Sequence, residues 1–114
     1  MTVVNVLAHV ELPDFDSGVA WYEGLFGRAP DRRPMDGSVE WQLNEHGGIQ
    51  VDAGSAGPAS VIIAVDDTDA VAAEMTASGL QPEVATVPSG QFRVATIQDP
   101  AGNTIMFTQT LNGD

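Results

Sequence analysis

Two polar residues near the N-terminus, His9 and Glu11, form the pair best suited to acid–base chemistry. On a β-strand, residues at spacing i, i+2 point from the same face. The carboxylate could there orient the imidazole or raise its pKa, so that His9 acts as a general base. The same spacing also suits a hydrogen-bonded polar pair at a sheet edge or a subunit contact, which is the commoner arrangement. His46, in a glycine-flanked turn, is expected to be exposed.

The composition excludes several kinds of chemistry. The 114 residues include no cysteine, which excludes disulfides, thiolate metal sites and a cysteine nucleophile. All four basic residues are arginines, so Schiff-base chemistry through lysine is excluded as well. The formal net charge of −12 disfavours nucleic acid and anionic membranes and favours a cationic ligand, although such acidity more often only maintains solubility.

The N-terminus has no basic region followed by an apolar stretch of signal-peptide length. The longest aliphatic run, residues 61–65, is too short to cross a bilayer. A cytoplasmic location is therefore expected.

The first half of the chain predicts one strand, one helix and three further strands. The first strand covers residues 4–12, and Asp14 or Asp16 can cap the helix that follows. Apolar residues recur in this helix every three or four positions until Gly27 ends it. The remaining strands are expected over residues 28–33, 39–43 and 48–52.

The second half repeats this order. A strand over residues 60–65 leads to a short helix, which is capped within residues 66–68 and ended by Gly79. Strands are expected over residues 82–87, 92–98 and 103–110, and Asp-Pro-Ala-Gly-Asn at 99–103 is typical of a tight turn. The order β-α-β-β-β thus occurs twice in one α+β domain, residues 1–114, with module one at 1–54 and module two at 58–111.

This plan resembles the vicinal oxygen chelate superfamily of glyoxalases, bleomycin-resistance proteins and dioxygenases. The resemblance covers nearly the whole chain. It rests on four motifs in family order, namely Leu12-Pro-Asp14, Trp21 to Gly27, Val65-Asp-Asp67 and the turn at 99–103. Because these motifs are turns and packing positions, they imply a fold more than a function. The resemblance implies an open barrel of two curved sheets around a cavity, and commonly a homodimer.

In metal-dependent members, the resemblance implies a His, Gln or Glu ligand on the first and last strand of each module. Those positions hold Leu7, Gln50, Ser60 and Met106 here. Leucine has no donor atom, serine is a poor ligand, and the methionine thioether is soft and neutral where a carboxylate is expected. A two-residue shift on the first strand would bring in His9 without adding a carboxylate. We therefore expect neither a metal nor another cofactor.

Strand alternation indicates which side chains would line the cavity. The orientation of Trp41 is open: either Trp41 faces the cavity, or Glu40 and Gln42 do. Val39 and Leu43 share the face of Trp41 and suggest packing, although aromatic residues commonly line ligand pockets. With Trp41 included, the expected ligand-contacting residues are His9, Glu11, Trp41, Gln50, Asp52, Thr96, Met106 and Thr108.

The leading hypothesis is a metal-free protein that binds a small, partly aromatic or cationic molecule, as the bleomycin-resistance branch sequesters its drug. The alternative is a lyase or isomerase of the glyoxalase type, either metal-dependent with unusual ligands or metal-free with His9 as the base and Glu11 orienting it. A third possibility is a non-catalytic accessory subunit whose own side chains fill the cavity.

Overall fold

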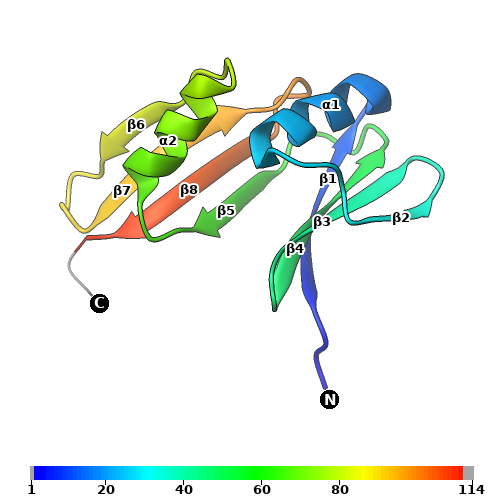
Figure 1. Cartoon of the computed structure of the whole chain (residues 1–114), viewed down its shortest axis with the longest axis horizontal. Coiled ribbons are helices and arrows are strands. Elements are labelled where there is room, and N and C mark those ends of the chain that lie inside the picture. Colours follow the sequence, from blue (N-terminus) through cyan, green and yellow to red (C-terminus); the bar gives the residue numbers. More distant parts are fainter. Residues whose placement is uncertain (1, 112–114) are drawn as a thin grey trace. The chain divides into compact units, whose positions relative to one another are not determined.

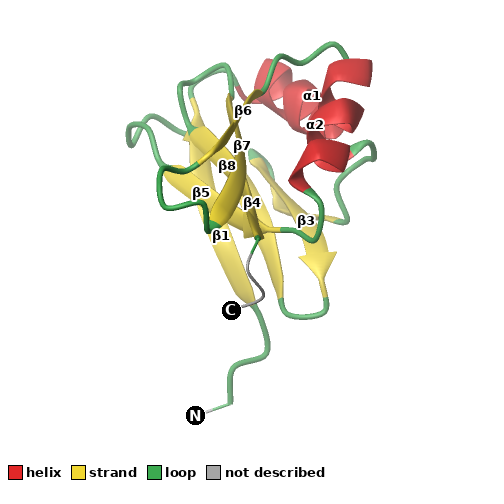
Figure 2. Cartoon of the chain, turned by 90° about the vertical axis from the view of Figure 1, so that its left-hand side faces the viewer, coloured by secondary structure: helices red, strands yellow, loops and turns green. Residues whose placement is uncertain are grey.

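A computed structural model describes residues 2–111 and contains two four-stranded sheets, each accompanied by one helix (Figures 1 and 2). The predicted order β-α-β-β-β occurs twice, and the α+β class is confirmed. Neither sheet closes on itself: the strand orders are β1-β4-β3-β2 and β5-β8-β7-β6. In chain order the elements are β1 (Val6–Leu12), α1 (Phe15–Phe26), β2 (Arg32–Met35), β3 (Ser38–Asn44), β4 (Gly47–Ala53), β5 (Ser60–Ala64), α2 (Thr68–Ala77), β6 (Glu83–Thr86), β7 (Phe92–Gln98) and β8 (Thr104–Thr110).

Internal contacts divide the described chain into two units. Unit 1 comprises residues 2–59 together with 99–103, and unit 2 comprises residues 60–98 and 104–111. The tight turn between β7 and β8 thus packs with unit 1, although both strands belong to unit 2. Two hydrogen bonds explain this: the Tyr22 hydroxyl donates to Asp99 Oδ2 over 2.7 Å, and Asn103 Nδ2 donates to the carbonyl of Glu11 over 3.2 Å.

The core of unit 1 lies on the α1 side of its sheet. β4 pairs in parallel with β1 and antiparallel with β3, and this register aligns the apolar residues of the three strands. Tyr22 and Phe26 of α1 pack on Trp41 with ring centroids 6.0 and 5.4 Å away. Burying these side chains is the main source of stability for the unit. The strand residues involved are each at most 1% exposed: Val10, Leu12, Val39, Trp41, Ile49 and Val51.

The helix boundaries follow the predicted caps. Asp14 accepts a hydrogen bond from the backbone N–H of Ser17 at the start of α1, and Gly27 ends that helix with φ of 72°. Asp67 caps α2 through the N–H of Ala70 over 3.0 Å. In the described part of the chain, neither helix is long and apolar enough to cross a membrane.

β2 begins four residues later than the sequence predicts. The Arg28 guanidinium donates to the Asp31 carboxylate over 2.7 Å and to the carbonyl of Gln42 over 2.5 Å. The same carboxylate accepts the N–H of Gln42 over 2.7 Å. These bonds hold residues 28–31 in a loop, so pairing with β3 starts only at Arg32, opposite Glu40.

Unit 2 buries its apolar side chains on one face in the same way. In register, Val61 lies beside Ile105, and Ile105 lies opposite Ile97. Thr68, at the start of α2, is fully buried and donates from its hydroxyl to the carbonyl of Arg93 over 3.0 Å. This bond ties the helix start to β7.

Gly48 lies in β4 where no side chain fits. A Cβ there would overlap the backbone carbonyl oxygen of Trp41 and lie 3.1 Å from a methyl group of Leu7. Because the β3 backbone cannot retreat without breaking its pairing with β4, we expect Gly48→Ala to lower the free energy of unfolding by about 2 kcal/mol. Urea denaturation followed by circular dichroism measures this change. Gly24→Ala is the control: nothing lies within 4 Å of a Cβ at this helical position, and equal losses for the two variants would contradict the crowding at Gly48.

Candidate functional site

One face of the unit 1 sheet points away from the buried apolar side chains and carries mostly polar residues. Residues paired across neighbouring strands share a face, so the strand register identifies the members of this set. We call it the polar face; it comprises Leu7, His9, Glu11, Arg32, Ser38, Glu40, Gln42, Gln50 and Asp52. It therefore unites four of the predicted ligand-contacting residues, His9, Glu11, Gln50 and Asp52.

A histidine–carboxylate pair joins β1 and β4 on the polar face. His9 Nε2 is 2.9 Å from Asp52 Oδ2, and the two side chains are 48% and 25% exposed. Gln50 Nε2 donates to both oxygens of the same carboxylate, over 3.2 and 3.1 Å. Burial raises the pKa of Asp52, but the Ser38 hydroxyl, the Gln50 amide and His9 together outweigh this cost and lower that pKa below its usual value. Asp52 is therefore an anion at neutral pH.

Ser38 lies opposite Asp52 in the strand register and is 3% exposed. Its hydroxyl lowers the pKa of Asp52 and so favours the ionised form, although Ser38 Oγ makes no hydrogen bond of standard geometry among residues 2–111. A buried hydroxyl without a partner is uncommon in folded proteins.

Glu11 does not pair with His9 as the sequence suggested. Its Oε1 accepts the backbone N–H of Ala56 over 3.2 Å, in the loop that follows β4. Gly54 permits this approach, since a Cβ at that position would overlap the Glu11 carboxylate. The carboxylate partner of His9 is therefore Asp52, which belongs to the neighbouring strand.

Trp41 lies on the opposite face from the polar residues. It is fully buried against α1, and its Nε1 donates to the carbonyl of Arg28 over 3.0 Å. Of the two orientations left open by the sequence, the structure has the one in which Glu40 and Gln42 face away from the helix. The inclusion of Trp41 among the ligand-contacting residues is corrected accordingly: it is a core residue.

The predicted ligand-contacting residues of unit 2 lie on the face of its sheet opposite the buried core. Thr96, Met106 and Thr108 are all half-buried there. Met106 is paired in register with Ile62, which is 67% exposed, and with Thr96. This face of unit 2 is therefore more apolar than the polar face of unit 1.

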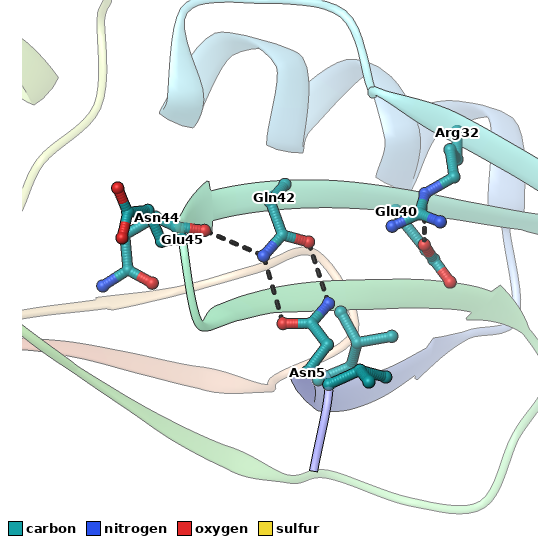
Figure 3. Close-up of a pocket in the computed structure, with 8 residues that line it drawn as sticks. Asn5, Arg32, Glu40, Gln42, Asn44 and Glu45 are labelled. Carbon is teal, nitrogen blue, oxygen red and sulfur yellow. Dashed lines mark hydrogen bonds and ion pairs between the residues drawn. The ribbon is translucent and has the colours of Figure 1, made fainter. Parts of the chain in front are cut away.

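A depression of about 470 Å³ opens on the polar face of unit 1 (Figure 3). Asn5 and Gln42 form a reciprocal amide pair there, with N–O distances of 2.9 and 3.1 Å. Figure 3 shows this pair apart from the ion pair between Arg32 and Glu40, whose Nε–Oε2 distance is 3.3 Å. Asn5 was not predicted from the sequence, although it lies two residues before Leu7, a spacing typical of side chains on one face of an extended chain.

The family's metal positions do not fit a metal in this chain. Leu7 and Met106 carry no hard donor, and Ser60 offers only a neutral hydroxyl. The amide of Gln50 already bonds the Asp52 carboxylate. Within residues 2–111, no three His, Asp or Glu side chains are grouped so that they could hold an ion.

Neither the family models nor the curated protein sequences that were searched contain a match to this chain. Solved structures do match. A glyoxalase/bleomycin resistance protein from Catenulispora acidiphila is 31% identical, with a TM-score of 0.86, and the match covers 95% of this chain and 99% of that one. A bleomycin-binding protein complexed with bleomycin is 22% identical, with a TM-score of 0.74 and coverage of 92% and 97%. A lactoylglutathione lyase from Agrobacterium tumefaciens is 16% identical, with a TM-score of 0.77 and coverage of 96% and 94%. The two latter likenesses concern the fold, whereas the first also shows descent: the chain belongs to the glyoxalase/bleomycin resistance family of the vicinal oxygen chelate superfamily.

Proposed function

We propose that this protein binds a small, partly aromatic or cationic molecule without the help of a metal ion. The observation that carries the proposal is the polar face of unit 1. Most of its members are polar, no helix of its own unit covers it, and within residues 2–111 its histidine and carboxylates are not grouped so that three of them could hold a metal ion. Sites for small molecules typically include a few precisely placed polar groups of this kind.

In unit 1, the residues proposed to contact a ligand are His9, Glu11, Gln50 and Asp52. The likeness in fold to a bleomycin-binding protein complexed with bleomycin supports a ligand of drug-like size. In unit 2, the residues proposed to contact a ligand are Thr96, Met106 and Thr108. We also propose that the protein is a homodimer, as the family resemblance implies.

The absence of a metal requirement is directly testable. In protein purified without chelator, elemental analysis should find Zn, Ni, Mn and Fe far below one atom per chain. Adding these ions should leave the melting temperature unchanged, whereas a bound small molecule from a screened library should raise it, because binding to the native state stabilises it. Gln50→Ala and Gln42→Ala provide matched variants. Near-stoichiometric metal whose stabilisation is lost only in Gln50→Ala would overturn the proposal.

A second candidate function, a metal-free lyase or isomerase, has one observation in its favour. The 2.9 Å contact between His9 and Asp52 is an arrangement in which a carboxylate orients an imidazole for proton transfer. If this function is correct, a bound molecule is chemically changed, and His9→Ala abolishes the change while leaving binding intact. Mass spectrometry of the recovered ligand measures this change. For the binding protein, we expect saturable binding and an unchanged ligand.

A further inference from the structure

We propose that Asp52 binds the cationic group of the ligand, and that His9 occupies that position when no ligand is bound. The inference rests on the proposed function and narrows it to one class of molecule, a planar amidinium or guanidinium with several N–H donors. It follows from the unused hydrogen-bonding capacity around Asp52, from the exposure of His9 and from the charges on the polar face.

The Asp52 carboxylate has acceptor capacity to spare. An ionised carboxylate offers about four lone-pair positions. The described hydrogen bonds of Asp52 come from one nitrogen of Gln50, shared between both oxygens, and from one nitrogen of His9, and the nearby Ser38 hydroxyl also favours its charge. A planar cation with parallel N–H groups can use both oxygens at once, which gives the strongest charge-assisted geometry available to a carboxylate.

The second acceptor beside Asp52 is Ser38 Oγ. Ser38 is 97% buried, being 3% exposed, and Oγ lacks a partner in the described part of the chain. Leaving such a group unpaired in the folded protein is costly, so its neighbourhood favours a ligand that brings a donor. Because Ser38 is paired in register with Asp52, an N–H group of a cation held by Asp52 would lie near Ser38 Oγ.

The His9 side chain can move away from Asp52 at a small cost in free energy. Its side chain is 48% exposed, and its contact with Asp52 is the one side-chain hydrogen bond that it makes among residues 2–111. Once displaced, the imidazole can regain hydrogen bonds to water. The contact between two partly exposed groups is therefore weak compared with a bidentate ion pair.

The charges of the polar face also favour a cation. Three carboxylates, Glu11, Glu40 and Asp52, face one guanidinium, Arg32, which leaves two negative charges when His9 is neutral. Arg32 already forms an ion pair with Glu40, with an Nε–Oε2 distance of 3.3 Å. No fixed cation of the described chain therefore neutralises Asp52, and a cationic ligand can do so.

Benzamidine and benzamide provide a matched pair of probes, since the second is the neutral isostere of the first. We expect benzamidine to bind at least tenfold more tightly than benzamide, because only the cation forms the charged pair with Asp52. Asp52→Asn should weaken benzamidine binding by about tenfold or more, and Asp66→Asn, an exposed charge-matched control in unit 2, should leave it unchanged. His9→Ala should bind benzamidine at least as tightly as the native chain, because it lacks the internal competitor.

The two histidines allow the displacement to be observed directly by NMR. Benzamidine should affect the two imidazole rings differently. The imidazole ¹⁵N signals of His9 should move on titration, whereas those of His46, which is 86% exposed in its turn, should stay fixed. In Asp52→Asn the His9 signals should no longer respond to the probe. Equal binding of benzamidine and benzamide, an unaffected Asp52→Asn variant or weaker binding in His9→Ala would each overturn the inference. If a screened neutral molecule still binds, the proposed function survives that failure; if no small molecule binds, the proposed function fails as well.

Discussion

Replacing Trp41 with alanine should remove about 3–5 kcal/mol from the free energy of unfolding, the largest loss that we expect from a single substitution in this chain. The indole is fully buried, packs on Tyr22 and Phe26, and satisfies the carbonyl of Arg28 through Nε1. Its removal leaves a cavity under α1 and an unpaired carbonyl. The free energy of unfolding of small domains is only about 5–15 kcal/mol, so the variant should be close to unfolding at 37 °C. A urea titration followed by far-UV circular dichroism measures the loss.

Two further variants make this result specific. Trp21 is a tryptophan of α1 that is only half-buried, so Trp21→Ala should cost clearly less than Trp41→Ala. Trp41→Phe keeps an aromatic ring in the core and should lose only about 1–2 kcal/mol, while its ligand binding stays that of the native chain. Weakened ligand binding in a well-folded Trp41→Phe variant would contradict the placement of this residue in the core.

Local signals made most of the elements predictable from the sequence. Asp14 and Asp67 mark the starts of α1 and α2 because their side chains accept backbone N–H groups of the first helical turn. Gly27 marks the end of α1 because it adopts the left-handed backbone conformation there. β2 was misplaced for the opposite reason. Its start depends on the contact of Arg28 with Gln42, fourteen positions away along the chain, and no local pattern encodes such a contact.

The candidate site was predictable in its faces but not in its partners. Period-two alternation placed His9 and Glu11 together, and Gln50 with Asp52, because it needs only the sequence of one strand. The pairing of His9 with Asp52 depends on the register between β1 and β4, which the sequence of either strand leaves free. Likewise, the face of Trp41 was decided by the aromatic rings of α1 and not by the pattern within β3.

The second large effect is expected at the turn between β7 and β8, where Asp99→Ala should lower the free energy of unfolding by about 3–4 kcal/mol. Asp99 is 5% exposed. Its carboxylate accepts four hydrogen bonds over 2.7–2.9 Å, from the Tyr22 hydroxyl, the N–H groups of Ala101 and Asn103, and Asn103 Nδ2. Burial, followed by the bond to Asp99, raises the pKa of Tyr22, so its phenol stays protonated and remains a donor. Alanine would leave this buried donor and the turn amides without their acceptor.

Asp66→Ala is the matched control, because it removes the same carboxylate from an exposed position, and it should change stability by less than about 0.5 kcal/mol. Tyr22→Phe removes only the hydroxyl and should cost about 1–1.5 kcal/mol. In a double-mutant cycle, Tyr22→Phe and Asp99→Ala should be strongly non-additive, because both remove the same hydrogen bond. Additive losses would mean that the turn is held by its own backbone alone. Coupling would instead explain why residues 99–103 pack with unit 1, and it would establish the Asp-Pro-Ala-Gly-Asn motif as a structural element separate from the ligand site on the polar face.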